Sequence, residues 1–307
     1  MALNPHADRS ASHGFIVVAV LWILGALAAL AAIYALYVRE TAAAFSVHND
    51  RLQGQALAQA GVELAVYQLT MIPESRPSSG QLSFRLGGAS VNVDFSSENA
   101  RIDLNAAPRD LLAGLFRSLG ARPDEADQFA ARIVGWRTPL VAGASDDEDS
   151  LYRAAGKPYG PRRGPFQHVN ELGLVLGLPP VLIEYALPHL TVYSGRPEIN
   201  VLNAPAEVLA AMPGMTPQWL PEFMAYRAAA PQDVLRARLG PAARFVTVQA
   251  SNATRMLVDV RLDATRRHRA EVVVLLLTGD TEPYRVLSWR DEIGEAQANG
   301  PARASAR

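Results

Sequence analysis

The chain opens with a polar segment and then becomes hydrophobic. Residues 1–14 are polar, and no charged residue occurs between Phe15 and Val38. A helix over this stretch is roughly 36 Å long, which is enough to cross a hydrocarbon core of about 30 Å. The sequence therefore predicts a membrane-spanning helix over 15–38. Arg9 together with the amino terminus makes the preceding segment weakly positive, which favours a cytoplasmic amino terminus and a head outside the cytoplasm.

Helical spacing continues beyond Arg39, where the apolar run ends. Residues 40–70 contain no proline, and their apolar side chains recur at intervals of three and four residues, the spacing of one helix face. The pattern predicts one long helix, half in lipid and half packed on a head domain. A polar break from Pro73 to Gly80 ends it. The apolar stripe of the second half comprises Leu57, Ala60, Gly61, Leu64 and Ala65.

The rest of the chain alternates between two patterns. Alternating apolar and polar residues predict strands, and apolar residues at helical spacing predict helices. Residues 139–165 are rich in glycine, proline and acidic residues and are predicted to form a loop. Strands are predicted at 81–86, 90–95, 101–104, 189–193, 198–202, 244–250, 256–262, 268–278 and 284–289, and helical regions from Asn105 and at about 123–136, 168–187 and 203–212.

One strand-to-helix junction occurs twice. Ile102-Asp-Leu-Asn105-Ala-Ala-Pro is followed later by Ile199-Asn-Val-Leu-Asn203-Ala-Pro. Asparagine is a good helix N-cap, and proline is tolerated in the first helical turn. The sequence therefore indicates the same turn chemistry at both junctions.

These patterns predict an α+β fold, in which a long N-terminal helix packs on an antiparallel sheet and an all-α domain is inserted. The polar tail, rich in alanine, glycine and arginine, is predicted to be disordered. The predicted segments are a leader at 1–14, a transmembrane helix at 15–38, the packed helix and first strands at 39–104, the all-α insertion at 105–188, the rest of the α+β domain at 189–290 and the tail at 291–307.

Composition excludes several classes of function. The 307-residue chain has a formal net charge of -1, which gives no basic surface for nucleic acid, and it has no cysteine, which excludes disulfides and thiolate sites. No metalloprotease, serine-hydrolase or phosphate-binding motif occurs, and the six histidines lack ligand spacing. The sequence predicts no enzyme.

An acidic run is the one candidate ion site in the sequence. Asp146, Asp147, Glu148 and Asp149 lie in the loop rich in glycine and proline, before Tyr152. Oxygen ligands on a flexible loop suit Ca²⁺. Asp146, Glu148 and Asp149 are therefore candidate Ca²⁺ ligands, and a solvated acidic loop without metal is the alternative.

Three interpretations of the hydrophobic segment remain open on the residues alone. A conventional secretory signal has an apolar stretch of about 7–15 residues, shorter than this one. A plain uncleaved anchor agrees with the length of the span. The third interpretation rests on Gly14 and Phe15, which lie at the junction of the polar leader and the span. This junction resembles the prepilin-type signal of type IV pilins and type II secretion pseudopilins.

The resemblance extends to the general secretion pathway protein K family. The segment Ala58–Ala65, the two asparagine junctions and the LTVYSG segment at 190–195 are similar to that family, and the resemblance covers roughly residues 14–290. Most pilin-like subunits carry a glutamate at the fifth mature position, which is Ala19 in this chain. The K type lacks that glutamate, as expected for a subunit with nothing ahead of it in the fibre.

Membership of that family implies a pilin-like fold and a structural function. A prepilin peptidase would cut between Gly14 and Phe15 and methylate Phe15. The mature protein would be a single-pass inner-membrane protein with a periplasmic head, and then a minor pseudopilin at the tip of the type II secretion pseudopilus, helping to initiate its assembly and protein export. Its partners would be the I- and J-type minor pseudopilins, bound through the N-terminal helices.

The family also implies calcium in the acidic loop, where Glu148, Asp149 and Tyr152 match its pattern. The acidic residues expected beside Trp136 are replaced by Gly135 and Arg137 in this chain.

A membrane-anchored DNA-binding or DNA-uptake protein is the alternative function. Residues 102–192 resemble tandem helix-hairpin-helix motifs, whose turns offer backbone N–H groups to phosphate. Both candidate turns, Gly120-Ala-Arg-Pro and Gly177-Leu-Pro-Pro, contain proline, which has no N–H to donate. The nearby lysine is Lys157 alone, and affinity for DNA depends on basic residues.

Overall fold

The computed structural model describes residues 11–71, 76–141, 143, 147–227, 229–277 and 281–291. It divides into two compact units, residues 1–55 and residues 56–307, and each unit is described here by itself. Helix α1 (Ala11–Met71) runs through the end of the first unit and into the second, which confirms the predicted long helix. In the first unit, the side chains of Phe15, Trp22 and Ile33 are at least 65% exposed, so this stretch packs against no core of its own.

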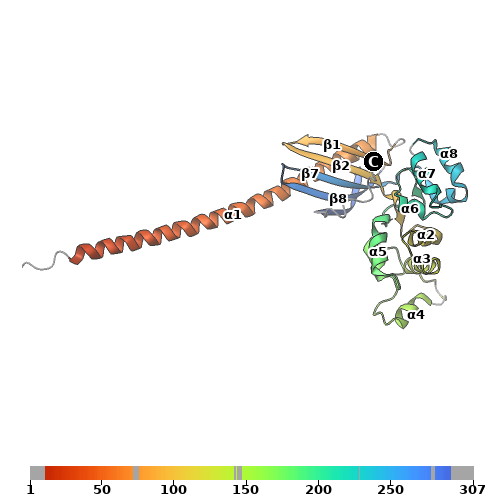
Figure 1. The fold of residues 1–307 in the computed structure, drawn as a ribbon, viewed down its shortest axis with the longest axis horizontal. Coiled ribbons are helices and arrows are strands. Elements are labelled where there is room, and N and C mark those ends of the chain that lie inside the picture. Colours follow the sequence, from red (N-terminus) through yellow and green to blue (C-terminus); the bar gives the residue numbers. More distant parts are fainter. Residues whose placement is uncertain are drawn as a thin grey trace, which may run out of the picture. The chain divides into compact units, whose positions relative to one another are not determined.

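The second unit contains a five-stranded antiparallel sheet. Its strands lie in the order β1-β2-β7-β8-β9, as Figure 1 shows for the four strands it labels. A two-residue turn joins β1 to β2, and Gly87 and Gly88 have the positive φ angles that such a tight hairpin requires. The strands are β1 (Ser79–Leu86), β2 (Ala89–Ser97), β7 (Ala253–Arg261), β8 (Arg267–Leu276) and β9 (Tyr284–Asp291). The strands predicted near these positions are confirmed.

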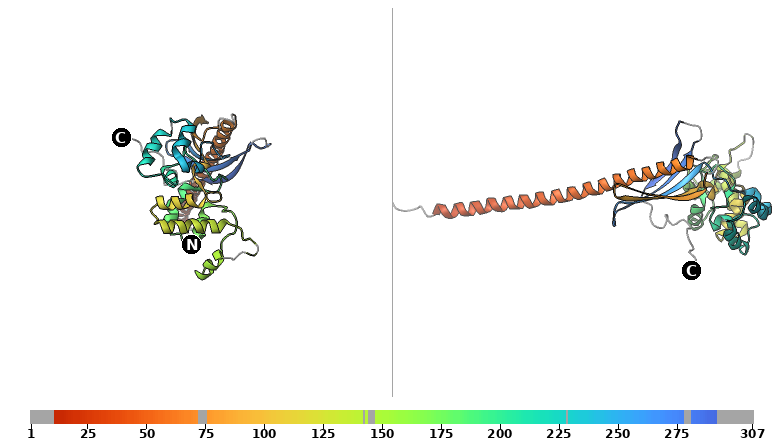
Figure 2. Two further views of the ribbon diagram at one scale, coloured as in Figure 1. Left: turned by 90° about the vertical axis from the view of Figure 1, so that its right-hand side faces the viewer. Right: turned by 90° about the horizontal axis from the view of Figure 1, so that it is seen from above.

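One face of the sheet packs against the last turns of α1. Val91, Val93 and Val258 are buried on this face, and the last turns of α1 run over the sheet (Figure 2). Of the predicted stripe, Leu57, Gly61 and Ala65 are buried, whereas Ala60 and Leu64 are only half-buried. Further buried side chains of α1 are Ala58, Val62, Val66 and Leu69. Gly61 lets the helix approach, because a Cβ on Gly61 would lie 3.0 Å from Cγ2 of Val93. Burial of alternate strand residues explains the period-two pattern in the sequence. The predicted packing of a long helix on an antiparallel sheet is confirmed.

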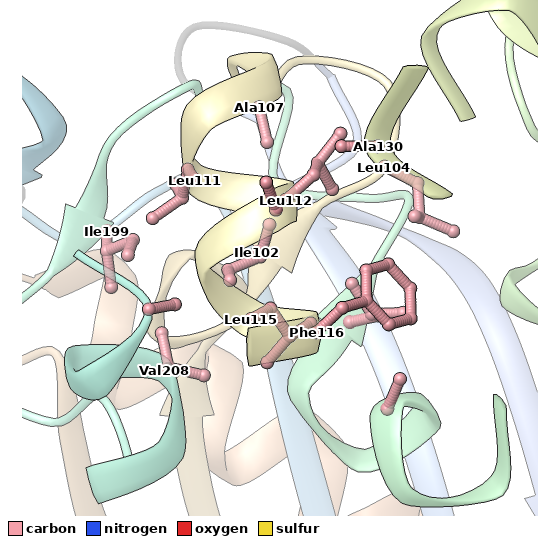
Figure 3. Close-up of a cluster of buried hydrophobic side chains, with 14 of the residues drawn as sticks. Ile102, Leu104, Ala107, Leu111, Leu112, Leu115, Phe116, Ala130, Ile199 and Val208 are labelled. Atoms are coloured by element: carbon pink, nitrogen blue, oxygen red, sulfur yellow. The ribbon is translucent and has the colours of Figure 1, made fainter. Parts of the chain in front are cut away.

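Helices fill the chain between β2 and β7 and share a second hydrophobic core. Ile102, Leu111, Phe116, Ile199 and Val208 meet in this core, although they lie far apart in the sequence (Figure 3). The helical part therefore continues beyond the range 105–188 and includes α6, α7 and α8. The helices are α2 (Arg109–Ser118), α3 (Pro123–Arg137), α4 (Asp147–Ala154), α5 (Pro180–Ala186), α6 (Ala206–Ala210), α7 (Trp219–Tyr226) and α8 (Gln232–Leu239). Four 3₁₀ segments accompany these helices, at Glu98–Ala100, Val169–Leu174, Leu187–His189 and Gly240–Phe245.

The prediction that residues 139–165 form a loop is wrong for Asp147–Ala154, which is α4. The three acidic residues of its first turn interact favourably with the positive end of the helix dipole. Tyr152, which is completely buried, supplies the tertiary contact. A short helix with one buried side chain has no apolar stripe, so periodicity alone does not detect it.

The repeated sequence junction is also a structural repeat. Each copy of the junction begins with a strand that pairs in parallel with a later strand. The pairs are β3 (Ile102–Asp103) with β4 (Leu190–Thr191) and β5 (Ile199–Asn200) with β6 (Val246–Thr247). At the first junction Arg137 donates hydrogen bonds to the carbonyls of Leu104 and Ala107. Arg227 donates in the same way to Val201 and Ala204. Each junction is thus closed by an arginine from a later helix.

Two predicted segments fall largely outside the described residues. The leader at 1–14 is described from Ala11 onward, and the tail at 291–307 only at Asp291, the last residue of β9.

Candidate functional site

The hydrophobic part of α1 is the first candidate site. Phe15–Val38 is long enough and apolar enough to cross a membrane, and none of it is buried by the described part of the chain. Gly14 lies within α1, and Phe15 is 76% exposed beside it. A helix with apolar side chains on every side needs lipid or other apolar helices around it, because exposing that area to water costs free energy.

At position 19 the span has an alanine, whereas the pilin-like subunits that the chain resembles mostly carry a glutamate at the corresponding position. Ala19 occupies that position, on the first turns of the apolar stretch. A carboxylate there would need a partner, because a charge in hydrocarbon is costly. This span can therefore enter a bundle of helices without a partner amine.

The predicted calcium ligands are placed on and before α4. Asp146 lies outside the described residues. Glu148 accepts a hydrogen bond of 2.9 Å from Nη1 of Arg132 on α3, and both side chains are largely buried. Asp149 forms an ion pair with Arg153, one turn further along α4. In the described part of the chain, no group of three or more acidic or histidine side chains is placed to hold a metal ion.

The described residues therefore do not fit a calcium site. Ca²⁺ takes six to eight oxygen ligands, and the two described carboxylates are each engaged by a guanidinium. Arginine stays cationic at all ordinary pH values and would repel a divalent ion. One oxygen, Oε1 of Glu148, is buried without a hydrogen-bond partner. The calcium prediction stays a prediction.

Tyr152 anchors α4 in the helical core. Its ring lies between those of Trp136 and Tyr159, with centroids 6.0 Å away in each case. The hydroxyl accepts a 2.9 Å hydrogen bond from the backbone N–H of Leu176. Burial raises the pKa of Tyr152 to about 12, and the nearby carboxylate of Glu148 also raises it.

A buried charge cluster that the sequence pattern does not indicate joins the sheet to the helical part. Glu98 is completely buried and accepts hydrogen bonds from Arg255 on β7 and Thr191 on β4. Arg101, three residues along the chain, lies 3.5 Å from the same carboxylate. Burial alone would raise the pKa of Glu98, but the charges of Arg255 and Arg101 and these hydrogen bonds lower it below its usual value. Thr191 and Arg255 are far from Glu98 in the sequence, so only the fold brings them to it.

Comparison with known proteins finds a family match in the middle of the chain. Residues 90–195, from β2 to the segment after β4, match the family described as type II secretion system (T2SS), protein K. The matched range contains α2, α3, α4 and α5, together with Glu98 and both candidate calcium ligands on α4.

Two relatives of this family are similar to the chain. The type II secretion system protein K of Klebsiella pneumoniae is 26% identical over 149 residues, which are 46% of this chain and 45% of that protein. The alignment thus spans less than half of the relative's length. One chain of the crystal structure of the GspK–GspI–GspJ complex from the type 2 secretion system of enterotoxigenic Escherichia coli has a TM-score of 0.51, with 17% identity over 79% of this chain and 94% of that chain. This second likeness supports the fold.

Proposed function

We propose that this chain is a structural minor pseudopilin at the tip of the type II secretion pseudopilus, where it helps to initiate assembly and protein export across the outer membrane. The observation that carries the proposal is the combination of a match to the protein K family at 90–195 with an exposed apolar helix near the amino terminus, long enough to span a membrane. The match of residues 90–195 to protein K favours this function over the DNA-binding alternative.

The apolar helix would act twice in this function. It would first anchor the protein in the bacterial inner membrane, with the head in the periplasm, and then pack among the helices of neighbouring subunits. Ala19 supports a tip position, because no buried carboxylate needs an amine from a subunit ahead. The bulk of α2–α8 beside the sheet supports a cap rather than a position inside the fibre.

The partners proposed are the I- and J-type minor pseudopilins. The support is the similarity in fold to a chain from a complex of three such subunits. A prepilin peptidase is the second proposed partner, and it would cut between Gly14 and Phe15.

Mass spectrometry of the mature protein from its native host tests the processing step. We expect an amino-terminal Phe15 carrying one N-methyl group. Gly14→Val should leave Met1 or the intact leader in place, whereas Ser12→Ala, a matched change in the leader, should be processed normally. An intact Met1 in the unaltered protein, or cleavage near residue 32, would instead indicate a plain anchor or a secretory signal.

Co-purification in detergent tests the assembly step. A charge in the middle of the span, as in Leu27→Asp, costs about 2.5–3.5 kcal/mol at a helix centre and has no partner there. We expect this variant to lose the I- and J-type subunits and to abolish secretion, while Leu27→Ile retains both. If secretion is unaffected by deleting the gene, the proposed function fails.

A further inference from the structure

Helices α3 and α4 meet in the region where the sequence pattern predicts calcium ligands. The carboxylates at this contact are paired with arginines, which is not the arrangement of a metal site. Figure 1 shows α4 at the far end of the helical part. Among the described contacts that hold α4 are the buried ring of Tyr152 and the carboxylate of Glu148.

Charge neutralisation at this contact comes from arginine. The guanidinium of Arg132 lies 2.9 Å from Oε2 of Glu148, and the two side chains are 28% and 15% exposed. An ion pair that is this poorly hydrated is screened little by salt and is stronger than a surface pair. Asp149, the second carboxylate, is paired with Arg153. Both negative charges are therefore compensated from within the chain.

The packing leaves no room for a further ligand from α3. A Cβ on Gly135 would lie 2.8 Å from Cδ and 2.9 Å from Oε2 of Glu148, closer than real Cβ atoms approach. The glutamate thus lies directly against the backbone of α3. A carboxylate on residue 135 would displace Glu148 and separate it from Arg132. The glycine and the arginine together create this direct contact between the two helices.

We infer that Arg132 takes the structural part that a divalent cation would otherwise play at this contact, so that α4 is held on α3 by an internal ion pair and the helical domain folds without calcium. The inference does not depend on the proposed function, because it concerns how the head is held together. It makes the head's stability insensitive to calcium in its surroundings.

Thermal denaturation of the full chain in detergent, in calcium chloride and in EGTA, tests this inference. The unaltered protein should have the same Tm in both. Arg132→Gln should lower the Tm by about 5 °C, because a buried carboxylate loses its charged partner in a domain of this size. Arg122→Gln removes a solvent-exposed pair with Glu125 on the same helix and should change the Tm by less than about 1 °C.

Hydrogen–deuterium exchange provides the local measurement. Amides of Asp147–Ala154 should exchange at the same rate in calcium and in EGTA, and faster in Arg132→Gln alone. In the Glu148→Gln background, adding Arg132→Gln should cause little further change, because the pair is already lost. A rise in Tm of more than about 2 °C on adding calcium to the unaltered protein would overturn the inference. So would equal effects of the Arg132 and Arg122 variants.

Discussion

Gly114→Ala is expected to be the most damaging small substitution in the helical core. Gly114 lies in the middle of α2, where α2 approaches α6, and it is buried. A Cβ at this position would lie 2.7 Å from the carbonyl carbon and 3.1 Å from the Cα of Ala211, and closer still to the carbonyl oxygen. Non-bonded carbons prefer about 3.5–4.0 Å, so the two helices would have to move apart by about 1 Å.

Two effects of opposite sign determine how much stability Gly114→Ala costs. Alanine favours a helix interior over glycine by about 1 kcal/mol. Overpacking costs about 1–3 kcal/mol and more where the neighbour cannot move, and here the neighbour is backbone. With backbone as the neighbour we take an overpacking cost of about 3–4 kcal/mol, at and above the top of that range, so the net loss is about 2–3 kcal/mol. This corresponds to a fall in Tm of roughly 5–10 °C for a domain of this size.

Thermal denaturation followed by circular dichroism measures this loss. Gly173→Ala is the matched control, because nothing lies within 4 Å of a Cβ at Gly173 and its φ is not positive. We expect the control to melt within about 1 °C of the unaltered protein. A Gly114→Ala variant that melts as the control does would refute the close approach of α2 and α6.

Three further outcomes follow from the buried groups. The pKa of Glu98 is lowered in the folded state, so its stabilisation is present above its unfolded pKa and is lost as pH falls through the folded value. Glu98→Gln should therefore cost about 3 kcal/mol at neutral pH, because Arg101 loses its ion pair and Arg255 keeps only Glu271, and should flatten the acid side of a Tm-against-pH curve. Tyr152→Phe should cost about 1–2 kcal/mol in chemical denaturation, since the N–H of Leu176 loses its acceptor; absorbance titration should show that one tyrosine with a pKa of about 12 is missing. Gly61→Ala should lower the Tm less than Gly114→Ala, because its contacts are valine side chains that can shift.

The elements that repeat a pattern over many residues were predictable. The span at 15–38 is a continuous apolar run of membrane-spanning length, the strands β2 and β7 alternate between buried and more exposed residues, and β8 carries a short apolar run. The second half of α1 was predictable for the same reason.

Short elements and the polar contacts between them were not predictable. No helix was predicted over α7 and α8, because each is about two turns long and, among the side chains whose burial is described, few are buried: Phe223 in α7, and Leu235 and Leu239 in α8. The ion pair of Arg132 and Glu148 depends on α4 being a helix, and local pattern did not indicate that. The run of acidic residues in the first turn was the one sequence feature that favoured a helix at α4. The same residues were equally consistent with a metal site.

Buried polar residues lie at the two places where the chain passes between the sheet and the helical core. The chain leaves the sheet after Ser97 and returns to it near Ser251, and the hydroxyls of these two serines lie 3.0 Å apart. Asn99 and Asn200 both donate to the carbonyl of Gln249. A hydrophobic contact would allow the two cores to slide, whereas buried hydrogen bonds are satisfied in one register only. The polar junction, with Glu98 beside it, therefore fixes how the helical core is attached to the sheet, while the two apolar cores provide most of the stability.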